Sequence, residues 1–295
     1  MKKNWRLCTG ISVIAGLMLA WSGVVAAQGG AASGSAAGAA ANTSMNKNIG
    51  YDTSPTSKEN ALELIKPADQ QEETAYRDFQ AVSTEKMAKK IELGEMFLKK
   101  YPQSGYRAAI YSGLTTAYLQ TNQVEKMEDA GEKTIALNPK DAQVLAMLGQ
   151  TLPRVMSSST PEPAKRLEKA EQYSKRAIEA VPTLKKPDNL SDQQFNQAKN
   201  QTLAIAHSGL GLVDFRRGDY AGAITELDES VKLDPRGDAT NYYVLGVANQ
   251  NAKHFAEAAS AFGKCAGFNG SLQATCKENS ETAKKLAAAP ASSPK

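Results

Sequence analysis

Two cysteines near the C-terminal end are the side chains whose chemistry is simplest to assign. Cys265 and Cys276 lie eleven positions apart and flank the tight-turn sequence GFNG at 267–270. Antiparallel helices on either side of that turn would bring the two sulfurs within reach of each other. In an oxidising compartment the expected product is a disulfide, and two neighbouring free thiols are the alternative. The third cysteine, Cys8, lies in an apolar N-terminal segment.

The remaining reactive side chains form no pattern that supports catalysis or metal binding. His207 and His254 are far apart in sequence, and neither has a cysteine or carboxylate at ligand spacing. Acidic residues such as Glu226 and Asp228 recur along helix faces, where they are ordinarily solvated. The sequence lacks nucleophile-elbow, phosphate-loop and dinucleotide-binding motifs. We therefore expect no enzymatic activity, no cofactor and no metal site.

Repeated helix pairs are the main organising feature of the chain. The run SGLGLVDFRRGDYAGAITELDESVKLDP at 208–235 contains a Leu-Gly pair, a Gly-Asp-Tyr turn, Ala223 and a closing Leu-Asp-Pro. The pattern returns in the next run, with Leu245 before Gly246, and Ala258 lies 35 residues after Ala223. This resembles the tetratricopeptide repeat, a helix pair of about 34 residues. A generic helical bundle with chance Leu-Gly pairs is the alternative.

Earlier and weaker copies extend the resemblance over about three quarters of the chain. The FLKKYPQS sequence at 97–104 is similar to repeats of bacterial cell-envelope proteins. The resemblance implies an all-α fold, an α-solenoid of stacked antiparallel helix pairs closed by a C-terminal capping helix. The units are expected at 67–104, 108–141, 142–182, 191–237 and 239–270, with the capping helix at 271–286.

Three local features are superimposed on this pattern. The third unit carries an inserted loop of about nine residues between Pro153 and Pro163. The stretch 191–217 reads as one long helix capped by Ser191, and its polar first half, 193–201, is expected to project beyond the stack. In the capping helix, Leu272, Thr275 and Leu286 are expected to face inward.

Small residues are expected where the two helices of a unit cross. Gly211 and Gly246 lie in first helices, and Ala223 and Ala258 lie in second helices. Small side chains at a crossing let the two helix axes approach to about 8 Å. The same positions therefore predict the closest contacts within the two C-terminal units.

The N-terminus reads as an export signal rather than as part of the fold. Basic residues Lys2, Lys3 and Arg6 precede an apolar stretch, and small residues at 25–27 offer a cleavage site. We expect a signal peptide at 1–27, although the 21 residues of 7–27 are also long enough for an uncleaved membrane anchor. The Gly/Ala/Ser-rich segment 28–66 and the tail 287–295 are expected to be disordered.

Charge excludes several classes of partner. The chain has 35 basic and 31 acidic residues, and the first 27 residues carry three of the basic ones. The remainder therefore has 32 basic against 31 acidic residues, a net charge of +1. With no basic stripe or polybasic patch, we expect no nucleic-acid binding and no membrane association beyond the signal segment. The expected location is the periplasm or the outside of the cell.

The resemblance also implies a binding surface. In tetratricopeptide arrays the first helices of the units line a concave groove that binds a protein or peptide segment. The equivalent positions here are apolar or neutral, without the Lys/Asn/Arg cluster by which chaperone-binding members hold a C-terminal carboxylate. They are Ser112, Thr116, Leu119, Gln143, Ala146, Gln150, Ser208, Leu212, Phe215, Tyr243, Val247 and Gln250.

The expected function is therefore an exported scaffold that holds an extended or helical protein segment in this groove, with Phe215 and Tyr243 as aromatic anchors. Two alternatives remain open. Several of these side chains could instead pack against the long helix, whose 193–201 segment could fold over the groove. The chain could also be a structural, self-associating component of the cell envelope.

Overall fold

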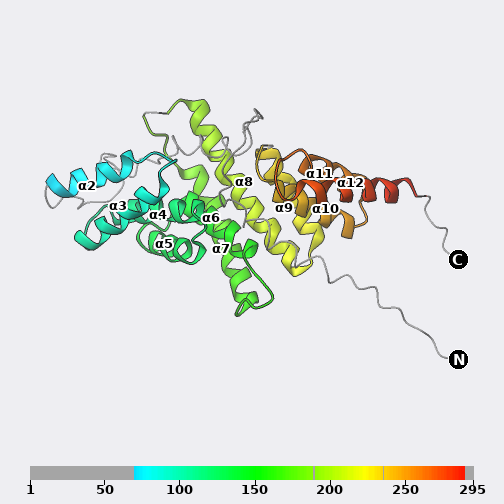
Figure 1. Ribbon diagram of the computed structural model, residues 1–295, viewed down its shortest axis with the longest axis horizontal. Helices are drawn as coiled ribbons and strands as arrows, with labels where there is room; N and C mark the ends of the chain where they lie inside the picture. The colour runs from blue at the N-terminus through cyan, green and yellow to red at the C-terminus, as the bar shows by residue number, and fades with distance from the viewer. Residues whose placement is uncertain (1–69, 189, 235, 290–295) are drawn as a thin grey trace, which may run out of the picture.

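The computed structural model describes residues 70–188, 190–234 and 236–289 (Figure 1). Within these residues the chain forms α-helices and one short 3₁₀ helix, with no β-strand. The expected signal peptide at 1–27 and linker at 28–66 lie outside the described residues, as does the end of the tail. The all-α fold class predicted from the sequence is confirmed.

The helices form a stack of antiparallel pairs that runs from α2 at one end to α12 at the other (Figure 1). Consecutive helices pack as α2/α3, α4/α5, α6/α7, α8/α9 and α10/α11, and α12 packs on α11. This is an α-solenoid with a terminal helix. The bounds are α2 (Gln70–Ala81), α3 (Met87–Lys100), α4 (Arg107–Gln120), α5 (Val124–Leu137), α6 (Ala142–Arg154), α7 (Pro163–Ala180), η2 (Val181–Thr183), α8 (Asp192–Arg217), α9 (Tyr220–Leu233), α10 (Ala239–Asn251), α11 (Phe255–Cys265) and α12 (Gln273–Ala288).

Side-chain caps define where several helices begin. Asp141 accepts a hydrogen bond from the Val144 amide at the start of α6, and Asp219 accepts one from the Gly222 amide at the start of α9. Such caps satisfy amide groups that the helix itself leaves unpaired. Gly218 ends α8 with φ of 81°, a left-handed conformation that glycine adopts without strain.

The long helix predicted for 191–217 is present as α8. Ser191 caps it, and a reciprocal bond from the Gln194 side chain to the Ser191 amide completes a capping box. The first turns of α8 rise above the neighbouring helices in Figure 1. One side of this polar half is nevertheless packed, because Phe195 and Ala198 are buried.

Besides a small third cluster around Val181, the apolar core consists of two clusters that meet within α8. One cluster runs from α2 to Val213, and the other runs from Leu212 to α12. The predicted close crossings lie in the second cluster. A Cβ atom on Gly211 would come within 2.6 Å of Leu227, and one on Gly246 would come within 2.6 Å of Phe262. Glycine is therefore required for both pairs of helices to pack this closely.

The C-terminal capping segment buries only part of the face that was expected: Leu272, just before α12, packs against the C-terminal cluster, but the buried stripe of α12 is a different one. Cys276, Ser280 and Ala283 are buried against α11, spaced four and three residues apart as one helical stripe requires. Thr275 is exposed and Leu286 is 40% exposed, so the expectation that they face inward is wrong. The Cys265–Cys276 contact fixes the rotation of α12 and so selects the buried stripe.

In the part of the chain that the structure describes, none of the helices combines the length and hydrophobicity needed to cross a bilayer.

Candidate functional site

The first helices of the units, α2, α4, α6, α8 and α10, are here called the inner layer. Every groove position proposed from the sequence lies on α4, α6, α8 or α10. Some of these side chains remain accessible, and others form contacts that join neighbouring helices.

Between α4 and α6, the polar side chains are used for packing. The Ser112 hydroxyl donates to the Asp141 carboxylate at the start of α6, and the Thr116 hydroxyl lies 3.9 Å from the Met147 sulfur. Burial raises the pKa of Asp141, and the hydrogen bonds from Val144, Ser112 and Gln143 act in the opposite direction. The Ser112 hydroxyl therefore holds the start of α6 in place.

A chain of side-chain hydrogen bonds continues from α6 to α10. Gln150 Nε2 donates to Ser208 Oγ at 2.9 Å, and Ser208 Oγ donates to Asn241 Oδ1 at 2.7 Å. Asn241 Nδ2 then donates to Ser230 Oγ at 3.2 Å, and Ser230 Oγ donates to the Ala204 carbonyl at 2.8 Å. This network crosses the boundary between the two apolar clusters, where satisfied polar groups fix the register of the helices.

The same boundary carries a second polar connection. Arg154, at the end of α6, forms an ion pair with Asp238, which caps α10 by accepting a hydrogen bond from the Thr240 amide. Burial alone would raise the pKa of Asp238, but the Arg154 charge and the bonds from Thr240 outweigh it, so the pKa is lowered. The pair joins the third unit directly to the fifth.

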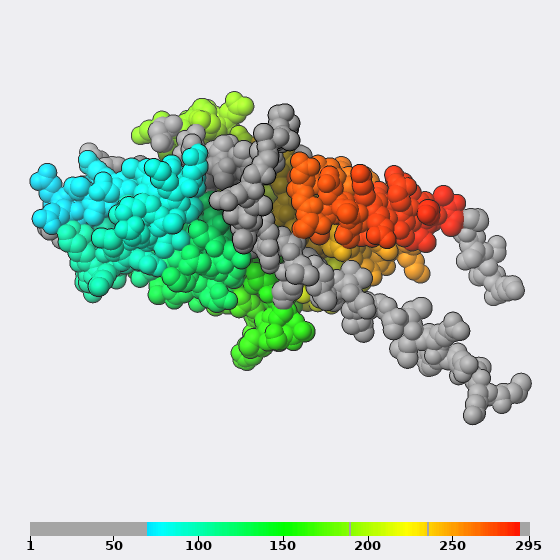
Figure 2. Space-filling view, viewed as in Figure 1, coloured from blue at the N-terminus to red at the C-terminus, as the bar shows by residue number. Residues whose placement is uncertain are grey.

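The predicted insertion is anchored to the long helix. Arg216 on α8 donates from Nε to the Pro153 carbonyl at 3.1 Å and from Nη2 to the Met156 carbonyl at 3.0 Å. Beyond this anchor, the loop and the beginning of α7 protrude from the stack as a green projection in Figure 2. Pro153 itself lies in the last turn of α6 rather than in the loop.

The proposed groove residues therefore fall into two groups. Ser208 is fully buried, and Leu212 and Tyr243 are each 5% exposed, so these side chains form part of the packed interior. Ala146 is also buried. The half-buried group, which keeps part of its surface accessible, consists of Ser112, Thr116, Leu119, Gln143, Gln150, Phe215, Val247 and Gln250.

Phe215 is the half-buried aromatic residue of this set. Its ring meets that of Tyr220 edge to face, with the centroids 5.9 Å apart. Phe215 and Val247 both border the C-terminal apolar cluster. Val247 and Gln250 lie one turn apart on α10 and so share a face. Phe215, Val247 and Gln250 are the accessible part of the predicted site at its C-terminal end.

Sequence reasoning missed the residues that join the units. Asp141 and Asp238 are recognisable from sequence as helix caps, because each precedes a helical run. Their partners Ser112 and Arg154 are 29 and 84 positions away in the chain. Asn241 carries no local signal at all, since its role depends on Ser208 from another helix.

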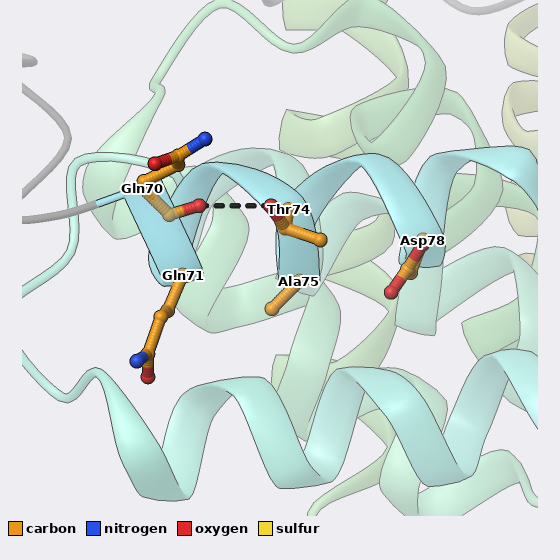
Figure 3. A pocket seen from close by; sticks show the side chains of 5 residues that line it. All are labelled: Gln70, Gln71, Thr74, Ala75 and Asp78. Carbon is orange, nitrogen blue, oxygen red and sulfur yellow. Dashed lines mark hydrogen bonds between the residues drawn. The ribbon is translucent and has the colours of Figure 1, made fainter.

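A shallow hollow lies on α2 at the N-terminal end of the stack. Gln70, Gln71, Thr74, Ala75 and Asp78 line it, as Figure 3 shows. All five come from one helix, and the Thr74 hydroxyl is bonded to the Gln70 carbonyl at 2.8 Å. The hollow therefore has no set of converging polar groups of the kind that marks a small-molecule site.

The two cysteines meet as their spacing predicted. Cys265 and Cys276 are both fully buried, with their Cα atoms 5.8 Å apart. This separation lies within the range that disulfides occupy. The pair joins the end of α11 to the first turn of α12.

The histidines lie apart from the cysteines. His207 Nδ1 lies 2.7 Å from Glu226 Oε2, which joins α8 to α9, and His254 is exposed at the turn before α11. Across the described residues no three His, Cys, Asp or Glu side chains are placed to hold a metal ion.

Comparisons with known proteins bear on the architecture alone. No protein-family model and no curated protein matches the chain. Solved structures with similar architecture include TTC0263, a thermophilic tetratricopeptide repeat protein of Thermus thermophilus, at 16% identity and a TM-score of 0.47, covering 72% of this chain and 99% of that one. The type IV pilus biogenesis factor PilW gives 14% and 0.48, covering 74% and 91%, and MamA gives 18% and 0.41, covering 72% and 96%.

Proposed function

We propose that this protein is an exported scaffold that binds a segment of another protein along its inner layer, and that it acts by binding rather than by catalysis. An α-solenoid presents an extended surface built from successive first helices, which suits an extended or helical ligand. The expected signal peptide is the basis for export to the periplasm or beyond.

The observation that carries the proposal is the half-buried neutral surface of Phe215, Val247 and Gln250. An aromatic ring, an aliphatic side chain and an amide lie on adjacent inner-layer helices, beside a firmly packed cluster. Aromatic anchors on rigid elements supply most of the energy of many protein interfaces, because they bury area at little cost in conformational entropy. A peptide could bury these side chains and bond the amide.

Position-specific photocrosslinking tests this surface. A benzoylphenylalanine placed at Val247 is expected to capture the partner in the native host, whereas one placed at the exposed Met96 of α3 captures much less of it. Because Met96 is 59% exposed, it controls for mere accessibility. Equal capture of every protein at both positions would reject the inner-layer site. Capture of this chain alone at Val247 would favour the self-associating alternative.

Replacing Phe215 with alanine measures how much this side chain contributes to the affinity for the partner. Phe215→Ala is expected to weaken partner binding by about 2 kcal/mol, or roughly thirtyfold, as for an interface anchor. Phe268→Ala is the matched control, since Phe268 is also half-buried beside the C-terminal cluster and lies 5.7 Å from a tyrosine ring, that of Tyr242. Titration calorimetry on both variants measures the loss of affinity. Equal losses would mean that Phe215 affects binding only through folding.

We also propose that Cys265 and Cys276 are joined by a disulfide that holds α12 against α11. Reduction, or the double change Cys265→Ala and Cys276→Ala, is expected to lower the free energy of unfolding by about 2–3 kcal/mol in the chain-entropy model. Thermal unfolding with and without reductant measures this loss. Two alkylatable thiols in protein taken directly from its native compartment would contradict the assignment.

A further inference from the structure

Lys90 occupies a position of α3 where an apolar residue is normally found. Met87, Gly94 and Phe97 are the buried residues of this helix, and Lys90 lies on the same stripe, three residues after the first and four before the second. A stripe with this spacing faces the neighbouring helices. The Lys90 side chain is accordingly half-buried.

The surroundings of Lys90 are built from α2 and α4. Its ammonium nitrogen lies 4.8 Å from the centre of the Phe79 ring, which is itself buried. Gly113 of α4 makes room for both side chains. A Cβ atom there would lie 3.4 Å from Lys90 Cε and 2.6 Å from Phe79 Cζ. The ammonium group therefore reaches the first helices of units one and two, at the N-terminal end of the inner layer.

No carboxylate of the described residues neutralises this ammonium. Two other lysines of α3 have polar partners, since Lys89 forms an ion pair with Glu92 at 3.0 Å and Lys100 donates to Gln71 at 3.1 Å. Burial lowers the pKa of Lys90, with no countering charge from a neighbour. A ring face compensates a desolvated cation only in part, so a free energy cost remains in the unliganded protein.

We propose that Lys90 is an anion-binding point of the inner layer and pairs with a side-chain carboxylate of the bound protein segment. This inference rests on the proposed function and names the partner chemistry, an acidic residue in the segment that crosses α2 and α4. One cation matches one carboxylate. Ser112 on α4 is already committed to Asp141, so it adds no second strong donor. Gly113 has no side chain that would cover the end of the Lys90 side chain.

Acetate tests whether Lys90 binds a carboxylate, without any knowledge of the partner. Lysine labelled at Cε with carbon-13 gives one resonance for each lysine, and Lys90→Arg identifies the Lys90 signal. Sodium acetate is expected to raise the titration midpoint of Lys90 in a saturable manner, whereas sodium chloride at equal ionic strength leaves it unchanged. The exposed Lys99 of the same helix is the internal control. A Lys90 response no larger than that of Lys99, or equal in chloride, would overturn the proposal.

Variants test the same point with the captured partner. Lys90→Met keeps the length of the side chain and removes its charge, and it is expected to weaken binding about tenfold while leaving the melting temperature unchanged or raised. Lys99→Met is expected to change binding less than about twofold, as for an exposed charge. Binding by Lys90→Met equal to the original would reject this inference and leave the scaffold proposal standing.

The partner itself distinguishes the source of the carboxylate. Replacing the acidic residues of its bound segment with Asn or Gln is expected to cause the same tenfold loss, and to cause none in the Lys90→Met background. A loss produced only by amidating the chain terminus would instead reject the side-chain assignment. If no partner is captured at Val247, the scaffold proposal fails. The acetate titration then still decides whether Lys90 binds a carboxylate.

Discussion

Gly209→Ala is expected to destabilise the protein by about 2–3 kcal/mol, as overpacking of a tight core contact does. Gly209 of α8 lies directly against α6. An added Cβ atom would lie 2.9 Å from the Gly149 carbonyl carbon, 3.0 Å from the Gln150 amide nitrogen and 2.4 Å from the Ser174 hydroxyl. Because two of these atoms are backbone, α6 and α8 would have to separate. Urea unfolding followed by circular dichroism measures the change.

Gly263→Ala is the matched control for this experiment. Gly263 lies within α11, is exposed, and has Ser280 Oγ as the nearest atom to an added Cβ, at an ordinary contact distance of 3.7 Å. Alanine there is expected to stabilise the protein by about 0.5–1 kcal/mol through helix propensity. Opposite signs for the two substitutions would show that the crossing requires glycine. A stabilising Gly209→Ala would contradict the close approach of α6 and α8.

Asp238→Asn is expected to cost about 1–3 kcal/mol at neutral pH, because it leaves the Arg154 charge without its partner. Arg154 is only 18% exposed, whereas Asp238 keeps 34% of its side chain exposed, so solvent screens part of the interaction. Asparagine still caps a helix well, and the change therefore isolates the ion pair from the cap. The free energy of unfolding of both proteins at pH 7 gives the cost.

Asp141→Asn is the matched comparison, and its effect on stability is expected to have the opposite sign. Asp141 also caps a helix, but burial raises its pKa and no cation among the described residues faces it. Its charge is therefore a cost that disappears as the pH falls through the folded-state pKa towards the usual value. Asparagine is expected to leave stability unchanged or to raise it by up to about 1 kcal/mol at pH 7, and the gain should shrink on acidification.

The two carboxylates thus give opposite dependences on pH. The lowered pKa of Asp238 means that its contribution is present above the usual value of 3.8 and is lost as the pH falls through the folded-state pKa. Unfolding measured from pH 7 to pH 3 should therefore show the Asp238→Asn cost declining only at the acid end. A cost for Asp238→Asn that does not vary over this range would mean that the ion pair contributes nothing.

The paired helices could be predicted because their signals are local. Leu-Gly pairs at a regular period, capping residues such as Ser191, and the Gly218 end of α8 each act within a few residues of their own position. The small residues Gly211 and Gly246 also correctly predicted where the two helices of a unit cross, since both helices of such a crossing belong to the same unit. The close Cys265–Cys276 contact followed from the same short-range reasoning.

The groove positions show where such reasoning reached its limit. A repeat pattern predicts which helix face points inward. The angle between units then decides whether a side chain on that face is exposed to solvent or packs against the next helix. Ser208 and Tyr243 were expected at the surface of the groove, and the structure buries both. The same dependence on helix rotation explains why Leu286 was wrongly expected to face inward.

The sequence by itself determined the all-α class, the pairing of the helices and the neutral side chains at the predicted groove positions, because these depend on residue type and on spacing of a few turns. Only the tertiary structure decided that Gln150, Ser208 and Asn241 join three helices, and that Lys90 lies over the Phe79 ring with no carboxylate of the described residues paired to it. Contacts between units depend on how each pair of helices is rotated against the next. That rotation is set by the summed packing of whole helices, which no short stretch of sequence encodes.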